Sequence, residues 1–231
     1  MKYIISSICI GLMLVAGNIS SAATTKTKPA EAVSTNKIVD TDESEQQPKP
    51  YYMLEEMNKI RYTQTKDREK SAVNLLTVAK ANMQKDPSQS NKTVYAAILA
   101  FVAGEKGGLK GLSLAKESYK LLHEVVSSDE PSTLDGYAYT TLGALYLNVP
   151  SWPIGFGSLK KAKDMIDKAI AKDPNNIDAN FYLAKYYIAK RNMQKARVTL
   201  EKVTKTNVRK FHTIGDSGRK KEAQKLLSTL K

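Results

Sequence analysis

The strongest constraint on the fold is a helical spacing of apolar residues that short polar turns interrupt at regular intervals. From Tyr51 onward, apolar side chains recur three and four residues apart, which places them on one face of a helix. One such series is Ala72, Leu75, Leu76, Ala79 and Met83. Glycine, proline and aspartate break the pattern, as at Gly107-Gly108 and Asp173-Pro174. The sequence therefore predicts an all-α chain of helical hairpins.

Small residues recur in register within this pattern. Ala162 and Ala196 are 34 residues apart, and each follows a pair of a leucine and a small residue, Leu142-Gly143 and Leu183-Ala184. The two pairs are 41 residues apart because the segment 150–157 (PSWPIGFG) lengthens the earlier hairpin. Stacked hairpins need small residues where two helices cross and large residues between hairpins.

This register resembles that of the tetratricopeptide repeat (TPR) family. The resemblance is clearest over residues 137–174 and 178–207, and degenerate copies fall at about 51–86 and 93–128. It implies that residues 51–231 form a TPR-like α-hairpin array, which is a right-handed superhelical stack.

From about Leu142 to its end, the chain is also similar to a group of exported bacterial tetratricopeptide proteins. The segments WPIGFG, DPNNIDANFY and GDSGRKKEAQKLL carry this similarity, in that order. The group overlaps in character with the periplasmic helical component of TRAP-type solute transporters. The resemblance implies an exported helical binding protein and assigns no chemistry.

Residues 1–23 have the features of a secretory signal peptide. A positive start is followed by an apolar run over residues 3–17 and then by small residues before a cleavage site at Ala23. The run is too short to serve as a spanning helix. Residues 24–50 contain few large apolar side chains and both signs of charge, so they are predicted to be a disordered linker. These features predict a soluble periplasmic protein with no transmembrane segment in the mature chain.

Positive charge is concentrated toward the C-terminus. The net charge is +13, and residues 159–231 hold 19 Lys/Arg and 7 Asp/Glu, a net of +12. One interpretation is association with an anionic envelope surface or an acidic protein. The alternative is a set of solvated, Lys-rich helix faces that maintains solubility. Nucleic acid is disfavoured as a partner because export removes the protein from most of it.

The residues that catalysis or metal binding requires are not assembled in the sequence. The two histidines, His123 and His212, are isolated, and the mature chain has no cysteine. Residues 215–218 (GDSG) match a serine-protease loop only in their letters, because no base and orienting carboxylate accompany them. They are predicted to form a polar turn, with its aspartate or serine as the N-cap of a closing helix from Arg219 to Leu230. We therefore predict a non-enzymatic protein without cofactor or metal.

Five residues are predicted to line the inner wall of the array. Phe181, Lys185 and Ile188 would face it from the last clear repeat, and Thr140 and Asn148 from the repeat before. Phe181 and Ile188 would supply apolar contact, and Lys185 would bind an anionic group. The alternative is that Phe181 and Ile188 pack on a neighbouring helix or on a C-terminal cap.

The insertion at 150–157 carries two more candidate contact residues, Trp152 and Phe156. Proline and glycine restrict its shape, so an exposed Trp152 would be a pre-formed anchor for a partner. Alternatively, Trp152 folds back and fills the gap between hairpins, as large aromatic side chains commonly do.

Together these features predict a periplasmic scaffold or adaptor that binds a protein or peptide along its concave face. Two alternatives stay open. One is an accessory subunit of a solute transport system that holds a small anionic ligand near Lys185. The other is electrostatic association with the anionic envelope surface through the Lys-rich C-terminal half.

Overall fold

The computed structural model describes residues 49–64, 66–128 and 134–230. The predicted signal peptide lies outside the described residues, as does the predicted linker except for its last two positions.

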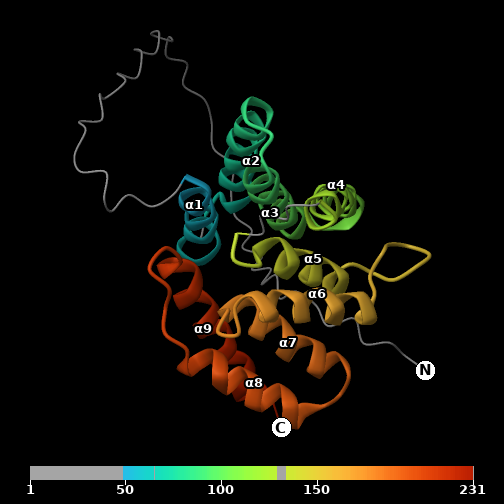
Figure 1. Ribbon diagram of the computed structural model, residues 1–231, viewed down its shortest axis with the longest axis vertical. Coiled ribbons are helices and arrows are strands. Elements are labelled where there is room, and N and C mark those ends of the chain that lie inside the picture. Colours follow the sequence, from blue (N-terminus) through green and yellow to red (C-terminus); the bar gives the residue numbers. More distant parts are fainter. Residues whose placement is uncertain (1–48, 65, 129–133, 231) are drawn as a thin grey trace, which may run out of the picture. The chain divides into compact units, whose positions relative to one another are not determined.

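Helices make up most of the described chain (Figure 1). They are α1 (Lys49–Thr63), α2 (Arg68–Lys85), α3 (Gln89–Lys106), α4 (Gly108–Val126), α5 (Tyr137–Asn148), α6 (Leu159–Lys172), α7 (Ile177–Ala189), α8 (Met193–Lys205) and α9 (Thr213–Thr229). Within the described residues, the only β pairing is an isolated bridge between Ser151 and Gly157. The prediction of an all-α fold is confirmed.

The helices pair into four hairpins, α1–α2, α3–α4, α5–α6 and α7–α8, and each hairpin packs on the next. The first helices of the hairpins, α1, α3, α5 and α7, also contact one another in chain order. This arrangement confirms the predicted TPR-like hairpin array.

Small residues allow the two helices of a hairpin to cross closely. Ala162 and Ala196, the residues that set the predicted register, are both fully buried. Gly143 of α5 faces α6, where a Cβ atom would lie 2.8 Å from Cγ1 of Ile166 and 3.4 Å from the carbonyl oxygen of Ala162. A larger side chain at Gly143 must therefore push α5 and α6 apart.

Replacing Gly143 by leucine is expected to lower the free energy of unfolding by about 1–3 kcal/mol, because the added side chain overpacks the α5–α6 crossing. Urea denaturation followed by circular dichroism measures the change. Gly104→Leu is the matched control, since a Cβ there meets no atom within 4 Å. That control should keep or raise stability, because glycine is a poor helix former. Equal losses in the two variants would contradict the close crossing.

The last helix, α9, contacts both α7 and α8 and also the first helix, α1 (Figure 1). Two glycines permit the approach of α9 to α1. A Cβ atom on Gly218 would lie 2.4 Å from the ring of Tyr62, and one on Gly215 would lie 2.3 Å from Nδ2 of Asn58. The helices α1, α3, α5, α7 and α9 thus form a closed series of contacts, whereas the sequence led us to expect an open inner surface.

The start of α9 corrects one prediction. The helix begins at Thr213 instead of Arg219, and its N-cap is His212 and not an aspartate or serine of the 215–218 segment. The carboxylate of Glu55 on α1 accepts hydrogen bonds from the backbone N–H groups of Ile214 (2.7 Å) and Gly215 (3.2 Å). A distant residue therefore satisfies the first-turn donors that a local cap would otherwise take.

Candidate functional site

The loop between α5 and α6 has a defined conformation. Phe156 packs against Tyr119 and Tyr146, with ring centroids 4.5 and 6.0 Å apart respectively. The N–H of Gly157 donates to the carbonyl of Pro150, and the N–H of Ser158 donates to the carbonyl of Tyr146, both at 2.9 Å. The aromatic contacts and the backbone hydrogen bonds together hold the base of the loop against the hairpin.

Trp152 lies at the tip of this loop and is 86% exposed, and Ile154 beside it is 63% exposed. Of the two interpretations of the insertion, gap filling is therefore wrong for Trp152, and Phe156 is the aromatic residue that fills the gap. Contact of Trp152 with a partner stays a prediction.

Two of the predicted wall residues come together in the structure. The Nζ of Lys185 on α7 donates a 2.9 Å hydrogen bond to Oδ1 of Asn148 at the end of α5. The same ammonium group lies 5.7 Å from the ring centroid of Tyr182, within the range of a cation–π interaction. Ile188 follows one turn later on α7 and is half-buried. These four residues form a partly exposed patch, here called the Lys185 patch.

Two other predicted wall residues lie beneath the surface. Phe181 is 6% exposed, and the guanidinium carbon of Arg219 on α9 lies 4.6 Å from its ring centroid. Thr140 is 3% exposed, and its hydroxyl donates to the carbonyl of Gly136 at 3.1 Å. A partner reaches Phe181 only if α9 moves, so α9 acts here as the C-terminal cap that the alternative interpretation proposed.

A buried ion-pair network holds α9 in place, and its pairing was not anticipated from the sequence. Asp216, fully buried, accepts from Nη2 of Arg209 at 2.6 Å, and Asp178 of α7 accepts from Nε of Arg219 at 2.8 Å. Arg209 also lies 3.6 Å from Asp178. Burial disfavours the charged form of Asp178, but Arg219 and Arg209 outweigh it and hold the pKa of Asp178 below its usual range. The network joins α7, α9 and the segment before α9.

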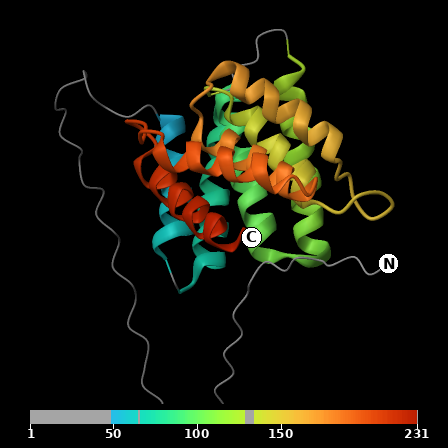
Figure 2. The same cartoon turned by 90° about the horizontal axis from the view of Figure 1, so that it is seen from below.

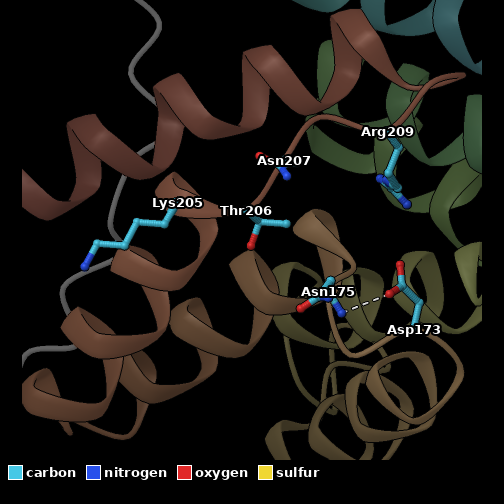
Figure 3. A pocket seen from close by; sticks show the side chains of 6 residues that line it. All are labelled: Asp173, Asn175, Lys205, Thr206, Asn207 and Arg209. Carbon is cyan, nitrogen blue, oxygen red and sulfur yellow. Dashed lines mark hydrogen bonds between the residues drawn. The ribbon is translucent and has the colours of Figure 1, made fainter.

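A polar surface pocket of ≈ 350 Å³ lies next to this network (Figure 3). Figure 3 shows Arg209 pointing toward Asp173 while Lys205 points away from the pocket. The other lining residues are Asn175, Thr206 and Asn207. Because Asp216 and Asp178 already pair with Arg209, the pocket carries mixed charge whose main cation is engaged in holding α9. We assign it no ligand.

Comparison with known proteins bears on the second half of the array. Residues 154–210 match the tetratricopeptide repeat family. The match runs from the tip of the α5–α6 loop through α6, α7 and α8 and includes the Lys185 side of the patch. Repeats of this family stack into extended surfaces that bind other proteins. No curated protein matches the chain.

None of the helices in the described ranges combines the length and the apolar character that crossing a bilayer requires.

Proposed function

We propose that this protein is an exported, periplasmic scaffold that binds a protein or peptide partner and catalyses no reaction. The signal-peptide features of residues 1–23 support export. The match to the tetratricopeptide repeat family supports a binding role. The partner class follows from the chemistry of the Lys185 patch.

The observation that carries the proposal is the bonding of Lys185. In the described part of the chain its ammonium group bonds to a neutral amide, that of Asn148, and not to a carboxylate. The amide gives the ammonium group no counter-charge, whereas a carboxylate from a partner would add an ion pair to the hydrogen bond. Tyr182 and Ile188 offer apolar contact on either side. The patch therefore suits a peptide segment that carries both an acidic and an apolar side chain.

The remaining predicted site residues divide by role in this proposal. Phe181 and Thr140 are buried, and Phe156 packs on Tyr119 and Tyr146, so these three residues are assigned a structural role. Trp152 protrudes from the α5–α6 loop, which begins directly after Asn148.

The alternative of a solute-transport accessory subunit requires a small-molecule cavity at Lys185. Two pockets in the described part of the chain lie away from Lys185. One is the mixed-charge pocket of Figure 3, and the other, ≈ 450 Å³, lies between α1 and α9 beside Tyr62 and Lys221. A peptide fits an open patch of this kind better than a small anion does.

Site-specific photocrosslinking in cells tests the proposal. A photoreactive residue replaces Ala189, which is exposed next to Ile188, and adducts are identified by mass spectrometry. We expect an adduct with a peptide segment, and we expect Lys185→Glu to reduce its yield by about tenfold or more, because a charge-assisted hydrogen bond becomes a repulsion.

Lys172→Glu on α6 is the matched control, with the same change of charge at an exposed site away from the patch. Its adduct yield should equal that of the wild type. Adducts that survive Lys185→Glu unchanged, or none with any protein, would reject the patch as the binding surface. The mass of the mature chain reports export in the same samples, with Thr24 expected as the first residue.

A further inference from the structure

The turns inside the hairpins carry an unusual set of exposed apolar side chains. Three of these turns are considered together with the first part of the helix that follows each. They comprise residues 107–116, 149–163 and 190–200, and these three segments are here called the tip edge. Leu109 is 84% exposed, Trp152 86% and Ile154 63%. Leu159 and Met193, the first residues of α6 and α8, are also exposed. These side chains protrude singly from successive turns and do not line a groove.

The tip edge is also strongly basic. Its three segments contain nine Lys/Arg and no Asp/Glu. The turns that join one hairpin to the next, at the opposite ends of the helices, instead carry acidic residues such as Asp86, Asp135 and Asp173. In these three hairpins, protruding apolar side chains and cations thus lie together at one edge, whereas the turn of the α1–α2 hairpin carries Asp67 and is not part of it.

The segments of the tip edge are neighbours in space. A Cβ atom on Gly155 of the α5–α6 loop would lie 3.5 Å from Cδ1 of Leu112, one turn along α4 from Leu109. The α5–α6 loop and the α7–α8 turn lie on the same side in both views (Figures 1 and 2). The loop presents Trp152 in a conformation that Phe156 and the backbone hydrogen bonds already hold, so docking costs little ordering of the loop.

From these observations we infer that the tip edge docks the protein on the surface of an anionic lipid bilayer. Trp152, Ile154 and Leu109 enter the interface between headgroups and acyl chains, where tryptophan is enriched in membrane proteins. The lysines around them lie against the anionic headgroups, and each contributes to binding through the negative surface potential. This role is separate from peptide binding at the Lys185 patch.

The geometry favours a bilayer over a protein partner at this edge. A protein surface binds an anchor residue in a matching pocket, usually near the centre of a closely packed interface. Here the apolar side chains protrude from separate turns with cations between them. A fluid lipid surface accepts separate protrusions without matching pockets and supplies negative charge next to each.

Trp152 reports the docking directly, because it is the only tryptophan of the chain. The full-length protein is used as the cell processes it, with its N-terminus established by mass spectrometry. Vesicles of phosphatidylethanolamine and phosphatidylglycerol should shift the emission of Trp152 to shorter wavelength, and brominated acyl chains should quench it. Vesicles of phosphatidylcholine alone should produce a much smaller shift.

Charge reversal tests the cations of the edge. Lys160→Glu with Lys161→Glu should weaken binding to the anionic vesicles at least about tenfold, since each cation near such a surface contributes a factor of roughly five. The matched control is Lys80→Glu with Lys85→Glu, the same change of charge at exposed sites in the C-terminal half of α2. This control should bind within about twofold of the wild type, because its charges lie farther from the bilayer than a Debye length.

Three results would overturn the inference. One is Trp152 emission that no vesicle changes. Another is an equal loss of binding in the two charge-reversed variants, which would indicate attraction by net charge alone. The third is emission of an environment-sensitive fluorophore attached at position 152 that shifts with a vesicle-free periplasmic extract but not with vesicles, which would assign the edge to a protein. None of these results affects crosslinking at the Lys185 patch, so the two proposals fail independently.

Discussion

Replacing Asp178 by alanine is expected to lower the free energy of unfolding by about 3–5 kcal/mol, since removing one partner of a buried ion pair leaves the other charge unpaired. Asp178 is the carboxylate that Arg219 contacts at 2.8 Å and that Arg209 approaches to 3.6 Å. In the variant, Arg219 keeps only Glu222 as an ion-pair partner among the described residues. Chemical denaturation followed by circular dichroism measures the loss.

Asp167→Ala is the control for the Asp178 substitution. Asp167 pairs with Lys163 at 2.7 Å on the exposed face of α6, so this variant should lose less than about 1 kcal/mol. Similar losses in the two variants would show that the network around Asp178 does not hold α9.

The Asp178 network also sets a pH dependence. The pKa of Asp178 is lower in the folded chain than in the unfolded one. The ionised carboxylate therefore contributes its full stabilisation of the fold above the unfolded pKa of about 4, and this stabilisation is lost as the pH falls through the folded pKa. The wild type should therefore lose more stability than Asp178→Ala between pH 5 and strongly acidic conditions, as the unfolding free energies of both proteins would show.

The second large effect is expected in the α5–α6 loop. Phe156→Ala should lower the free energy of unfolding by about 2–3 kcal/mol, because the ring packs against Tyr119 and Tyr146. This loss is somewhat smaller than for a fully buried phenylalanine, since the Phe156 side chain is half-buried. Trp152→Ala, four residues away in the same loop, should change the free energy of unfolding by less than about 0.5 kcal/mol, because this side chain is solvent-exposed. Thermal or urea unfolding distinguishes the two. The reverse order would mean that Trp152, and not Phe156, holds the loop.

Trp152 and Phe156 also show a feature that the sequence alone does not predict. The PSWPIGFG segment identifies an insertion and two large aromatic side chains. Nothing in its composition says which ring turns inward, because that depends on the space between Tyr119 of α4 and Tyr146 of α5. The sequence interpretation left burial and partner contact both open for Trp152, and only the packed hairpins exclude burial.

The candidate binding surface was anticipated in part. Helical spacing on α7 placed Lys185 and Ile188 toward the inner wall, and the repeat register brought Asn148 beside Lys185. The same spacing placed Phe181 on that wall, where it is covered by α9. Spacing within one helix predicts which face a residue occupies, but it carries no information about a helix that returns from elsewhere in the chain.

The sequence alone determined the helical class and the pairing of helices into stacked hairpins. These properties depend on interactions between residues within about one repeat of each other, such as the crossing at Gly143 and Ile166. Only the tertiary structure decided that α9 begins at Thr213, that Glu55 on α1 binds its first turn, and that the inner helices form a closed series of contacts. Glu55 and Ile214 are 159 residues apart. Contacts at that separation leave no period in the sequence, since they form only when the complete array brings its first and last helices together.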